Sequence, residues 1–297
     1  MPIFTIPFLA MGSLCECRLP ANTQQEAEQI AEIAIQEVRR IELKYSRYRD
    51  DSILSQINGQ AGRGAVKIDK ETNELLDYAE VLFRASDGKF DISSGILRRA
   101  WNFKHAMLPE PALLDHLRGK IGWDKIQRTS DTVYLPETEM EIDFGGYGKE
   151  YAADCAAALL LNEGISHGLI DLGGDLRILG PQLDGRPWQI GIQNPRKSDQ
   201  IIATIPVSSG ALATSGDYER FFDLDGIRYC HILDPDSAYP VNYWQSVSVL
   251  APLSIAAGSY STITMLKQMQ GKAWLSESGL AYLLIDNDGQ VSRQDVV

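Results

Sequence analysis

Glycine-containing turns divide the second half of the sequence into short apolar segments, and this division restricts the fold more than any other feature. Asp225-Gly226 joins segment 219–224 to segment 227–233, which is the signature of a two-residue β-hairpin. Further strands are predicted at 187–193, 201–208, 246–251 and 280–286. Connections this short return the chain beside itself, so we expect a mostly antiparallel sheet.

The first half adds helices to this pattern. Residues 4–19 are strand material broken at Met11-Gly12, and Thr23-x-x-Glu26 is a capping box that begins a helix over about 22–41. Further elements are predicted as helices at 69–86, 149–162 and 254–269 and as a strand at 141–146. No repeat or linker interrupts the chain, so the prediction is a single α+β domain over 1–297, with packed helices and room for two lobes.

Charge and hydropathy exclude two classes of partner. The formal net charge is −12 and no Lys/Arg-rich run occurs, so nucleic acid is not an expected partner. No uninterrupted apolar run is long enough to span a bilayer, so membrane insertion is not expected. Residues 3–15 imitate a signal peptide, but they lack a positively charged start, and Leu14 before Cys15 makes a poor lipoprotein site. We therefore expect a cytoplasmic protein.

The cysteines are scattered along the chain. They are Cys15, Cys17, Cys155 and Cys230, and no CxxC spacing occurs among them. Paired ligands at such spacing are typical of structural zinc sites. Buried reduced thiols are therefore the expected state of these side chains.

Five turns rich in glycine or other small residues lie at predicted strand ends. They are Met11-Gly12-Ser13, Phe144-Gly-Gly-Tyr-Gly-Lys149, Leu172-Gly-Gly-Asp175, residues 208–210 with 214–217, and Ala256-Ala-Gly-Ser-Tyr-Ser-Thr262. Backbone N–H groups in such turns can approach an anion closely, and a following helix adds its dipole. One such turn alone is more often ordinary turn chemistry. Together, the five predict a cradle for a phosphorylated ligand.

Neither of two familiar nucleotide-binding signatures fits these turns. The 145–149 segment lacks the GxxxxGK[ST] spacing of a P-loop, and no GxGxxG follows a strand inside a βαβ unit. Lys149, in the first turn of a predicted helix, either faces solvent or contacts the ligand. His231 stands with Asp234 at a strand exit, where it is either a histidine on a sheet face or an acid–base group.

Taken in order, these segments resemble the ApbE family of FAD:protein FMN transferases over nearly the whole chain. The matching motifs are Met11-Gly12, Tyr45-Ser-Arg-Tyr48, Gly88-Lys-Phe-Asp-Ile92, Asp143-Phe-Gly-Gly-Tyr-Gly-Lys149 through Asp154, Leu172-Gly-Gly-Asp175, Thr214-Ser-Gly-Asp217-Tyr218 and His231-Ile-Leu-Asp-Pro235. The resemblance implies a T-fold-like domain that holds FAD in a cleft, with magnesium on the pyrophosphate. It also implies transfer of FMN to a Thr or Ser hydroxyl of a target flavoprotein, with release of AMP.

The resemblance also implies roles for particular residues. His231 and Asp234 are the catalytic candidates. The expected FAD contacts are Met11, Tyr48, Asp91, Lys149, Asp154, Gly174, Ser215, Gly216, Asp217 and His231. The expected magnesium ligands are Gly148, through its backbone carbonyl, and Thr262.

One departure from the family pattern concerns the metal. Gly258 stands where the family has a metal-binding aspartate, so weakened or absent magnesium binding is expected. Glu150 could replace that carboxylate, but an exposed first-turn glutamate is the expectation because acids are favoured there. Two functions stay open: an active transferase, with hydrolysis of FAD as a variant, or an FAD-binding carrier, sensor or partner subunit that no longer transfers FMN.

Overall fold

A computed structural model describes residues 1–295 of the chain. Within them, an eight-stranded sheet has the order β1-β2-β6-β7-β10-β13-β14-β15, and its neighbouring strands pair antiparallel. The strands are β1 (Ile3–Ala10), β2 (Ser13–Pro20), β6 (Gly168–Leu172), β7 (Asp175–Gly180), β10 (Gly210–Gly216), β13 (Trp244–Ala251), β14 (Ala281–Asp286) and β15 (Val291–Gln294). The predicted α+β class with mostly antiparallel pairing is confirmed.

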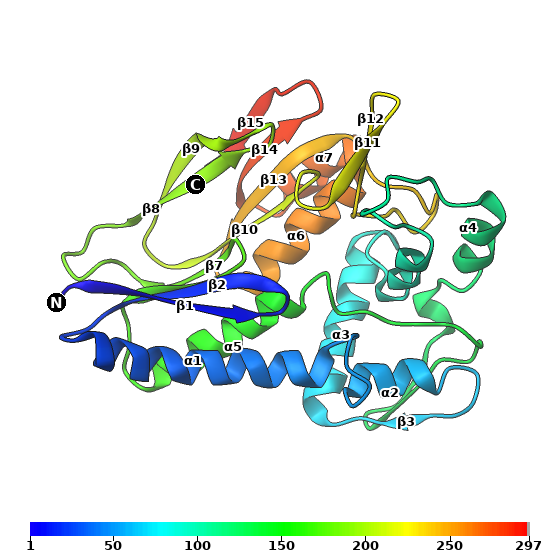
Figure 1. Ribbon diagram of the computed structural model, residues 1–297, viewed down its shortest axis with the longest axis horizontal. Helices are drawn as coiled ribbons and strands as arrows, with labels where there is room; N and C mark the ends of the chain where they lie inside the picture. The colour runs from blue at the N-terminus through cyan, green and yellow to red at the C-terminus, as the bar shows by residue number, and fades with distance from the viewer. Residues whose placement is uncertain (296–297) are drawn as a thin grey trace.

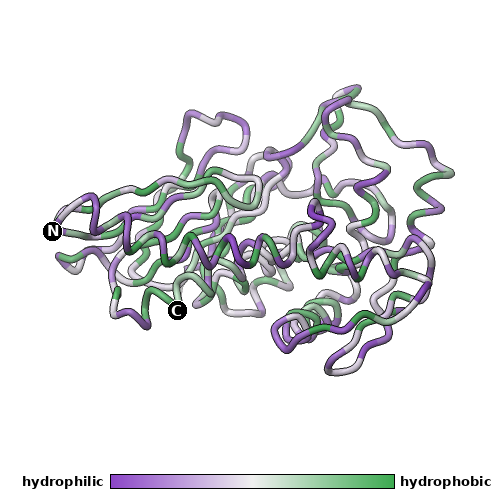
Figure 2. The backbone as a smooth tube through the Cα atoms, turned by 60° about the horizontal axis from the view of Figure 1, so that its bottom comes forward, coloured by the Kyte–Doolittle hydropathy of each residue, from purple (hydrophilic) through white to green (hydrophobic). Residues whose placement is uncertain are grey.

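Helices α1 (Gln24–Tyr45), α5 (Gly148–Asn162) and α6 (Ser254–Leu266) pack against one face of this sheet (Figure 1). The Thr23 hydroxyl accepts a hydrogen bond from the Glu26 N–H at 3.1 Å, and the Glu26 carboxylate accepts from the Asn22 N–H at 2.8 Å. This reciprocal pair confirms the predicted capping box. Hydrophobic and hydrophilic residues alternate along α1 and the strands in Figure 2, as expected for elements with one buried side.

The hairpin of β8 (Trp188–Asn194) and β9 (Lys197–Val207) covers the opposite face. Trp188, Ile190 and Ile192 alternate along β8 and pack with residues of β6, β7 and β14. Both faces of the central strands are therefore covered, and β6 and β7 are buried at nearly every position.

A second group of elements lies on the right in Figure 1, beyond the end of α1. It contains α2 (Ile53–Gly59), α3 (Lys70–Ala85), η1 (Ile92–Arg99), α4 (Pro111–Arg118), η2 (Trp123–Lys125) and the small sheet of β3 (Val66–Lys67), β4 (Gln127–Arg128) and β5 (Thr132–Tyr134). The remaining elements are the hairpin β11 (Phe221–Leu224) and β12 (Ile227–Cys230), with η3 (Gln268–Gln270) and α7 (Gly271–Glu277). Asp225 and Gly226 have φ values of 51° and 79° at the hairpin turn, as a type I′ turn requires.

The predicted strand at 141–146 is wrong. The Asn58 side chain donates to the Ile142 carbonyl at 3.0 Å and accepts from the Ile142 N–H at 2.8 Å. A side-chain amide thus satisfies both backbone groups that a neighbouring strand would otherwise pair. Asn58 ends a helix that the sequence did not predict, so this partner was hidden as well.

The cysteines are all free, with Cys15, Cys17 and Cys230 buried and Cys155 half-buried. The expectation of reduced thiols is confirmed. Across residues 1–295, no helix combines the length and the apolar character needed to span a membrane.

Candidate active site

A cavity of about 1350 Å³ opens where the predicted glycine turns meet, although residues 208–210 of the fourth turn do not line it. Its wall includes the β1–β2 turn, the segment entering α5, the β6–β7 turn, the end of β10 and one turn of α6. Small-molecule pockets usually hold roughly 300–1,000 Å³, so this space suits a ligand of dinucleotide size. Segments separated by more than 200 residues along the chain therefore surround one ligand-sized space.

Two of these turns need left-handed backbone. Met11 and Gly12 have φ values of 52° and 70°, and Gly173 and Gly174 have values of 66° and 95°. A Cβ on Gly173 would lie 2.8 Å from the Ser13 Cβ, because the two turns pack directly against each other. At Gly173, glycine is thus required both by conformation and by contact.

The N-terminus of α5 opens into the cavity. Gly148, Lys149 and Glu150 form its first turn and line the wall, and the N-cap residue Tyr147 provides no side-chain cap. The Gly148 N–H donates to the Phe144 carbonyl at 2.7 Å, while the N–H groups of Lys149 and Glu150 have no intrahelical acceptor, and the helix dipole adds positive potential there. This end of the cavity is therefore suited to an anion such as a phosphate.

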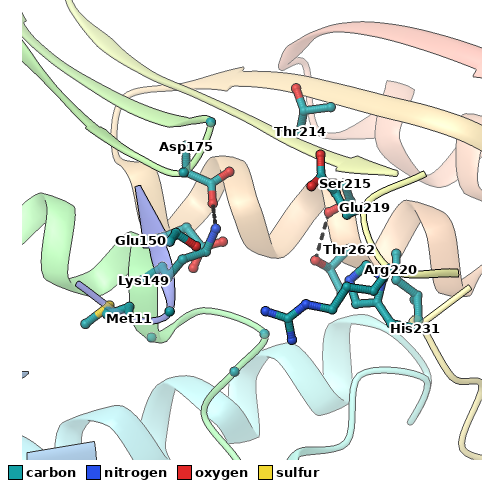
Figure 3. Close-up of a pocket in the computed structure, with 18 of the residues that line it drawn as sticks. Met11, Lys149, Glu150, Asp175, Thr214, Ser215, Glu219, Arg220, His231 and Thr262 are labelled. Atoms are coloured by element: carbon teal, nitrogen blue, oxygen red, sulfur yellow. Dashed lines mark hydrogen bonds and ion pairs between the residues drawn. The ribbon is translucent and has the colours of Figure 1, made fainter. Parts of the chain in front are cut away.

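Two cations face the same space. The Lys149 Nζ lies 2.6 Å from an Asp175 oxygen and 3.3 Å from the Leu172 carbonyl. Desolvation lowers the pKa of Lys149, but Asp175 and then Glu150 raise it, so the net pKa is raised and the lysine stays charged. Arg220 follows β10, and its guanidinium extends into the cavity (Figure 3). No ion-pair partner for Arg220 occurs among the described residues.

His231 lies beside Arg220 at the cavity wall. Its backbone N–H donates to the Arg220 carbonyl at 3.0 Å, which fixes the strand exit. The residue is exposed to solvent where it faces the cavity. Desolvation, and then the Arg220 charge, lower its pKa below the usual value. The imidazole is therefore neutral at pH 7 and able to accept a proton.

A hydroxyl cluster connects β10 to α6. The Ser215 Oγ lies 2.8 Å from the Ser261 Oγ. It also lies 3.1 Å from the Thr262 Oγ1 (Figure 3). Next to it, a Cβ on Gly216 would lie 2.3 Å from the Tyr218 Cε1. The tyrosine ring covers the glycine, so this stretch of β10 has no room for a larger residue.

The expectation of an exposed Glu150 is wrong. Glu150 is only 6% exposed, and its side chain packs against α6 at Gly258. Burial first, and the nearby Asp175 second, raise the pKa of Glu150. The Glu150 Oε2 is buried without a hydrogen-bond partner among the described residues. An unpaired buried carboxylate oxygen is costly, so this atom marks a place where a ligand could bind.

Most of the predicted site residues line the cavity. They are Met11, Tyr48, Asp91, Gly148, Lys149, Gly174, Ser215, Gly216, His231 and Thr262. The Asp91 carboxylate is already occupied: it accepts from the Ser93 N–H and Oγ at 2.8 and 2.7 Å and from the Trp123 N–H at 2.9 Å. Asp91 therefore holds the loops together beneath the wall.

Asp154 and Asp234 do not line the cavity in the described chain. Asp154 accepts from the N–H groups of Ser254 and Ile255, at 2.9 Å each, and so caps α6. Asp234 pairs with the Lys89 Nζ at 2.9 Å. These structural contacts explain why an aspartate stands at positions 154 and 234. Of the Lys89–Asp234 pair, only Lys89 lines the cavity wall.

Asp217 also lies outside the cavity wall formed by residues 1–295. Its two oxygens accept from Arg196 at 2.7 Å each, and Arg228 lies 3.8 Å away. Arg196 belongs to the β8–β9 turn, so the pair fixes that hairpin to the end of β10. The motif aspartate thus positions its neighbour Gly216 and does not face the cavity.

Sequence reasoning missed several parts of the wall. Arg220 belongs to none of the glycine turns, and residues 189–193 of β8 enter the wall from the opposite face of the sheet. Asp175 was recognised only as a turn residue, although it holds Lys149. The sequence offered one signal for Arg220, which is that a cation stands two residues after the 214–218 motif.

Carboxylates alone do not form a metal site here: in residues 1–295, no group of three or more His, Cys, Asp or Glu side chains could hold an ion. Magnesium also accepts hydroxyl, carbonyl, water and phosphate oxygens. Thr262 and Gly148 line the cavity wall and carry a hydroxyl and a backbone carbonyl, and Glu150, whose Oε2 is buried without a hydrogen-bond partner among the described residues, belongs to the same wall. The available donors therefore fit a hard divalent cation.

Comparison with known proteins gives a consistent result. The sequence profile of the ApbE family matches residues 11–284. The FAD:protein FMN transferase of Treponema pallidum is 32% identical over 277 residues, covering 86% of this chain and 76% of the relative. That of Escherichia coli (strain K12) is 26% identical over 290 residues, covering 94% and 83%.

Solved structures agree with the sequence matches. The ApbE protein from Thermotoga maritima has a TM-score of 0.89 at 30% identity and covers 99% of this chain and 97% of its own. The flavin transferase ApbE from Vibrio cholerae has a TM-score of 0.86 with the same coverages. Its identity is 24%, so that likeness concerns the fold alone.

Proposed function

We propose that this chain, which belongs to the ApbE family, transfers FMN from FAD to a Thr or Ser hydroxyl of a target protein and releases AMP. The observation that carries the proposal is the convergence of the α5 N-terminus, Lys149 and Arg220 on one cavity of dinucleotide size, with His231 beside them. An uncapped helix end and two cations suit a pyrophosphate, and a neutral imidazole suits a hydroxyl that must lose its proton.

The reaction conserves the number of P–O bonds. The acceptor hydroxyl oxygen forms a bond to the phosphorus of the FMN half, while the pyrophosphate bond from that phosphorus to the AMP oxygen breaks. The hydroxyl proton moves to the His231 imidazole, and AMP leaves as its phosphate anion. Lys149, Arg220 and the first N–H groups of α5 offset charge on the phosphoryl oxygens, which supplies most of the catalysis expected of such a site.

Magnesium fits the proposal through the Gly148 carbonyl and the Thr262 hydroxyl, with phosphate oxygens and water completing its shell. When bound, the ion would neutralise charge on the pyrophosphate. The Ser215 hydroxyl orients Thr262 through its 3.1 Å contact. The protein groups around this point are thus fixed by both β10 and α6.

A direct assay tests the proposal. The protein is incubated with FAD, Mg²⁺ and a flavinylation-type peptide that contains one threonine, and AMP release and peptide mass are followed. We expect AMP and an FMN adduct in equal amounts. The matched control is the same peptide with valine in place of threonine, which has nearly the same shape but no hydroxyl. A second control replaces FAD with FMN, which has no AMP to release.

The other outcomes have definite meanings. AMP with free FMN and an unmodified peptide would indicate hydrolysis of FAD. Tight FAD binding without AMP would indicate a flavin-binding relative that does not transfer, the alternative favoured by Gly258. Absence of FAD binding at micromolar concentration would refute the assignment of the cavity.

A further inference from the structure

Gly258 and Glu150 compete for the same space. A Cβ on Gly258 would lie 2.5 Å from the Glu150 Oε1, 2.6 Å from its Cγ and 2.7 Å from its Cδ. Any larger residue at position 258 would therefore require the Glu150 side chain to move from this place. Glycine is disfavoured inside a helix, and here it is explained by the carboxylate of α5 that fills the space beside α6.

The position of this carboxylate relative to Thr262 is informative. Thr262 lies four residues after Gly258, one turn along α6, so the two positions share a face of the helix. Helical side chains lean toward the N-terminus, and thus the Thr262 side chain leans toward the space at Gly258. The Glu150 carboxylate occupies the volume from which an aspartate at position 258 would act together with Thr262.

The contacts of Glu150 do not account for its burial. Lys149, the adjacent cation, pairs with Asp175. Glu150 Oε2 has no hydrogen-bond partner within residues 1–295, although both Glu150 and Thr262 line the cavity. Buried carboxylates are normally paired, hydrogen-bonded or bound to a metal. Among the described residues, neither a salt bridge nor a hydrogen bond satisfies this oxygen; of the two remaining ways to lower its cost, protonation or a bound cation, the cation fits the Thr262 hydroxyl in the same wall.

We infer that Glu150 supplies, from α5, the carboxylate ligand for a divalent cation at a site that also includes Thr262. This inference rests on the proposed function, since the cation would serve the pyrophosphate end of the FAD cavity. Compared with the family motif, the carboxylate comes from α5 instead of α6, and glycine at position 258 leaves the space that it occupies. A hard ion such as Mg²⁺ is the chemistry that carboxylate, hydroxyl and carbonyl oxygens select.

Cation binding can be measured without turnover. Mn²⁺ is titrated into protein saturated with FAD and without acceptor, and the free ion is followed by its EPR signal. We expect Glu150→Gln to weaken Mn²⁺ binding by about tenfold or more, because loss of a group that supports a ligand already costs roughly 10–100-fold. Glu163→Gln is the matched control: it removes the same charge at the exposed C-terminal end of α5 and should bind Mn²⁺ like the parent.

A swap tests the shared space. Glu150→Ala should lose Mn²⁺ affinity, and Gly258→Asp alone should bind poorly because its side chain collides with Glu150. The double variant Glu150→Ala/Gly258→Asp should recover binding to within about threefold of the parent, since one carboxylate replaces the other. Thermal unfolding and FAD fluorescence establish that each variant is folded and loaded.

Two results would overturn the inference. One is a Glu150→Gln protein that binds Mn²⁺ as tightly as the Glu163→Gln control. The other is a folded double variant that binds no better than Glu150→Ala. If the double variant does not fold, the comparison of the two glutamine variants still decides. FAD-dependent AMP release by the parent, with Mn²⁺ affinity unchanged by Glu150→Gln, would reject the inference and leave the proposed function intact.

Discussion

Replacing Asp217 by asparagine separates a structural aspartate from a ligand contact. The Asp217 side chain is 5% exposed and accepts both of its short hydrogen bonds from Arg196, at 2.7 Å each. Asparagine keeps the shape and removes the charge. One of its two terminal atoms becomes a donor that faces the guanidinium, so the bidentate arrangement cannot persist.

The magnitude follows from these contacts. A hydrogen bond to a charged group contributes about 1.5–3 kcal/mol, against about 1 kcal/mol for a neutral one, so two such bonds lose roughly 2 kcal/mol. The Arg196 side chain is 35% exposed, so water can hydrate its guanidinium when the pair is weakened, which offsets part of the lost stability. We expect the free energy of unfolding to fall by about 1–2 kcal/mol. For a chain of 297 residues the unfolding entropy is about 0.6 kcal/mol/K, so this would lower Tm by roughly 2–3 °C.

Urea unfolding of Asp217→Asn, Arg196→Met and the double variant would measure the pair directly, with a coupling energy of about 1 kcal/mol or more. Asp223→Asn is the matched control, since Asp223 pairs with Arg228 at 3.0 Å on the surface and is 53% exposed. Its loss should cost less than about 1 kcal/mol. FAD affinity should stay unchanged in all of these variants. Unchanged stability with tenfold weaker FAD binding would refute the reasoning and place Asp217 on the ligand.

Three further predictions concern the cavity itself. Arg220→Met should weaken FAD binding about tenfold in a fluorescence titration, because the guanidinium lines the cavity. The free energy of unfolding should stay unchanged, because no ion pair to Arg220 occurs in residues 1–295. An effect on stability alone would contradict this prediction. The pKa of His231 is lowered, so the ring stays neutral until the pH falls below the usual value of about 6.5, and the acid limb of AMP release should lie below it; a limb centred higher would exclude this ring as the base. Gly216→Ala should destabilise the protein by about 1–3 kcal/mol in urea unfolding and displace Tyr218; wild-type stability would mean that the ring moves freely.

Features set by a few neighbouring residues could be predicted from the sequence. The capping box at Thr23 and the turn at Asp225-Gly226 each depend on partners no more than four residues away, and both occur. The antiparallel sheet followed from the short turns for the same reason. Local chemistry thus determined most element boundaries to within a few residues.

Features that depend on a distant partner could not be predicted. Whether 141–146 becomes a strand is decided by Asn58, 84 residues away from Ile142 in the chain. Asp154 was expected at the ligand, but it caps a helix that begins 100 residues later. In each case the residue type was informative, while its use was settled by an element whose position the sequence does not reveal.

Gly258 shows how this limitation affects functional reasoning. A missing aspartate was a reason to expect weak metal binding, because a motif is compared position by position along the chain. A cation, however, responds to which oxygens surround it and not to which helix carries them. Position 150 lies 108 residues before position 258, yet the two side chains would occupy the same volume. The loss of a motif carboxylate therefore argues against the chemistry only when no neighbouring carboxylate fills its space, and here Glu150 fills it.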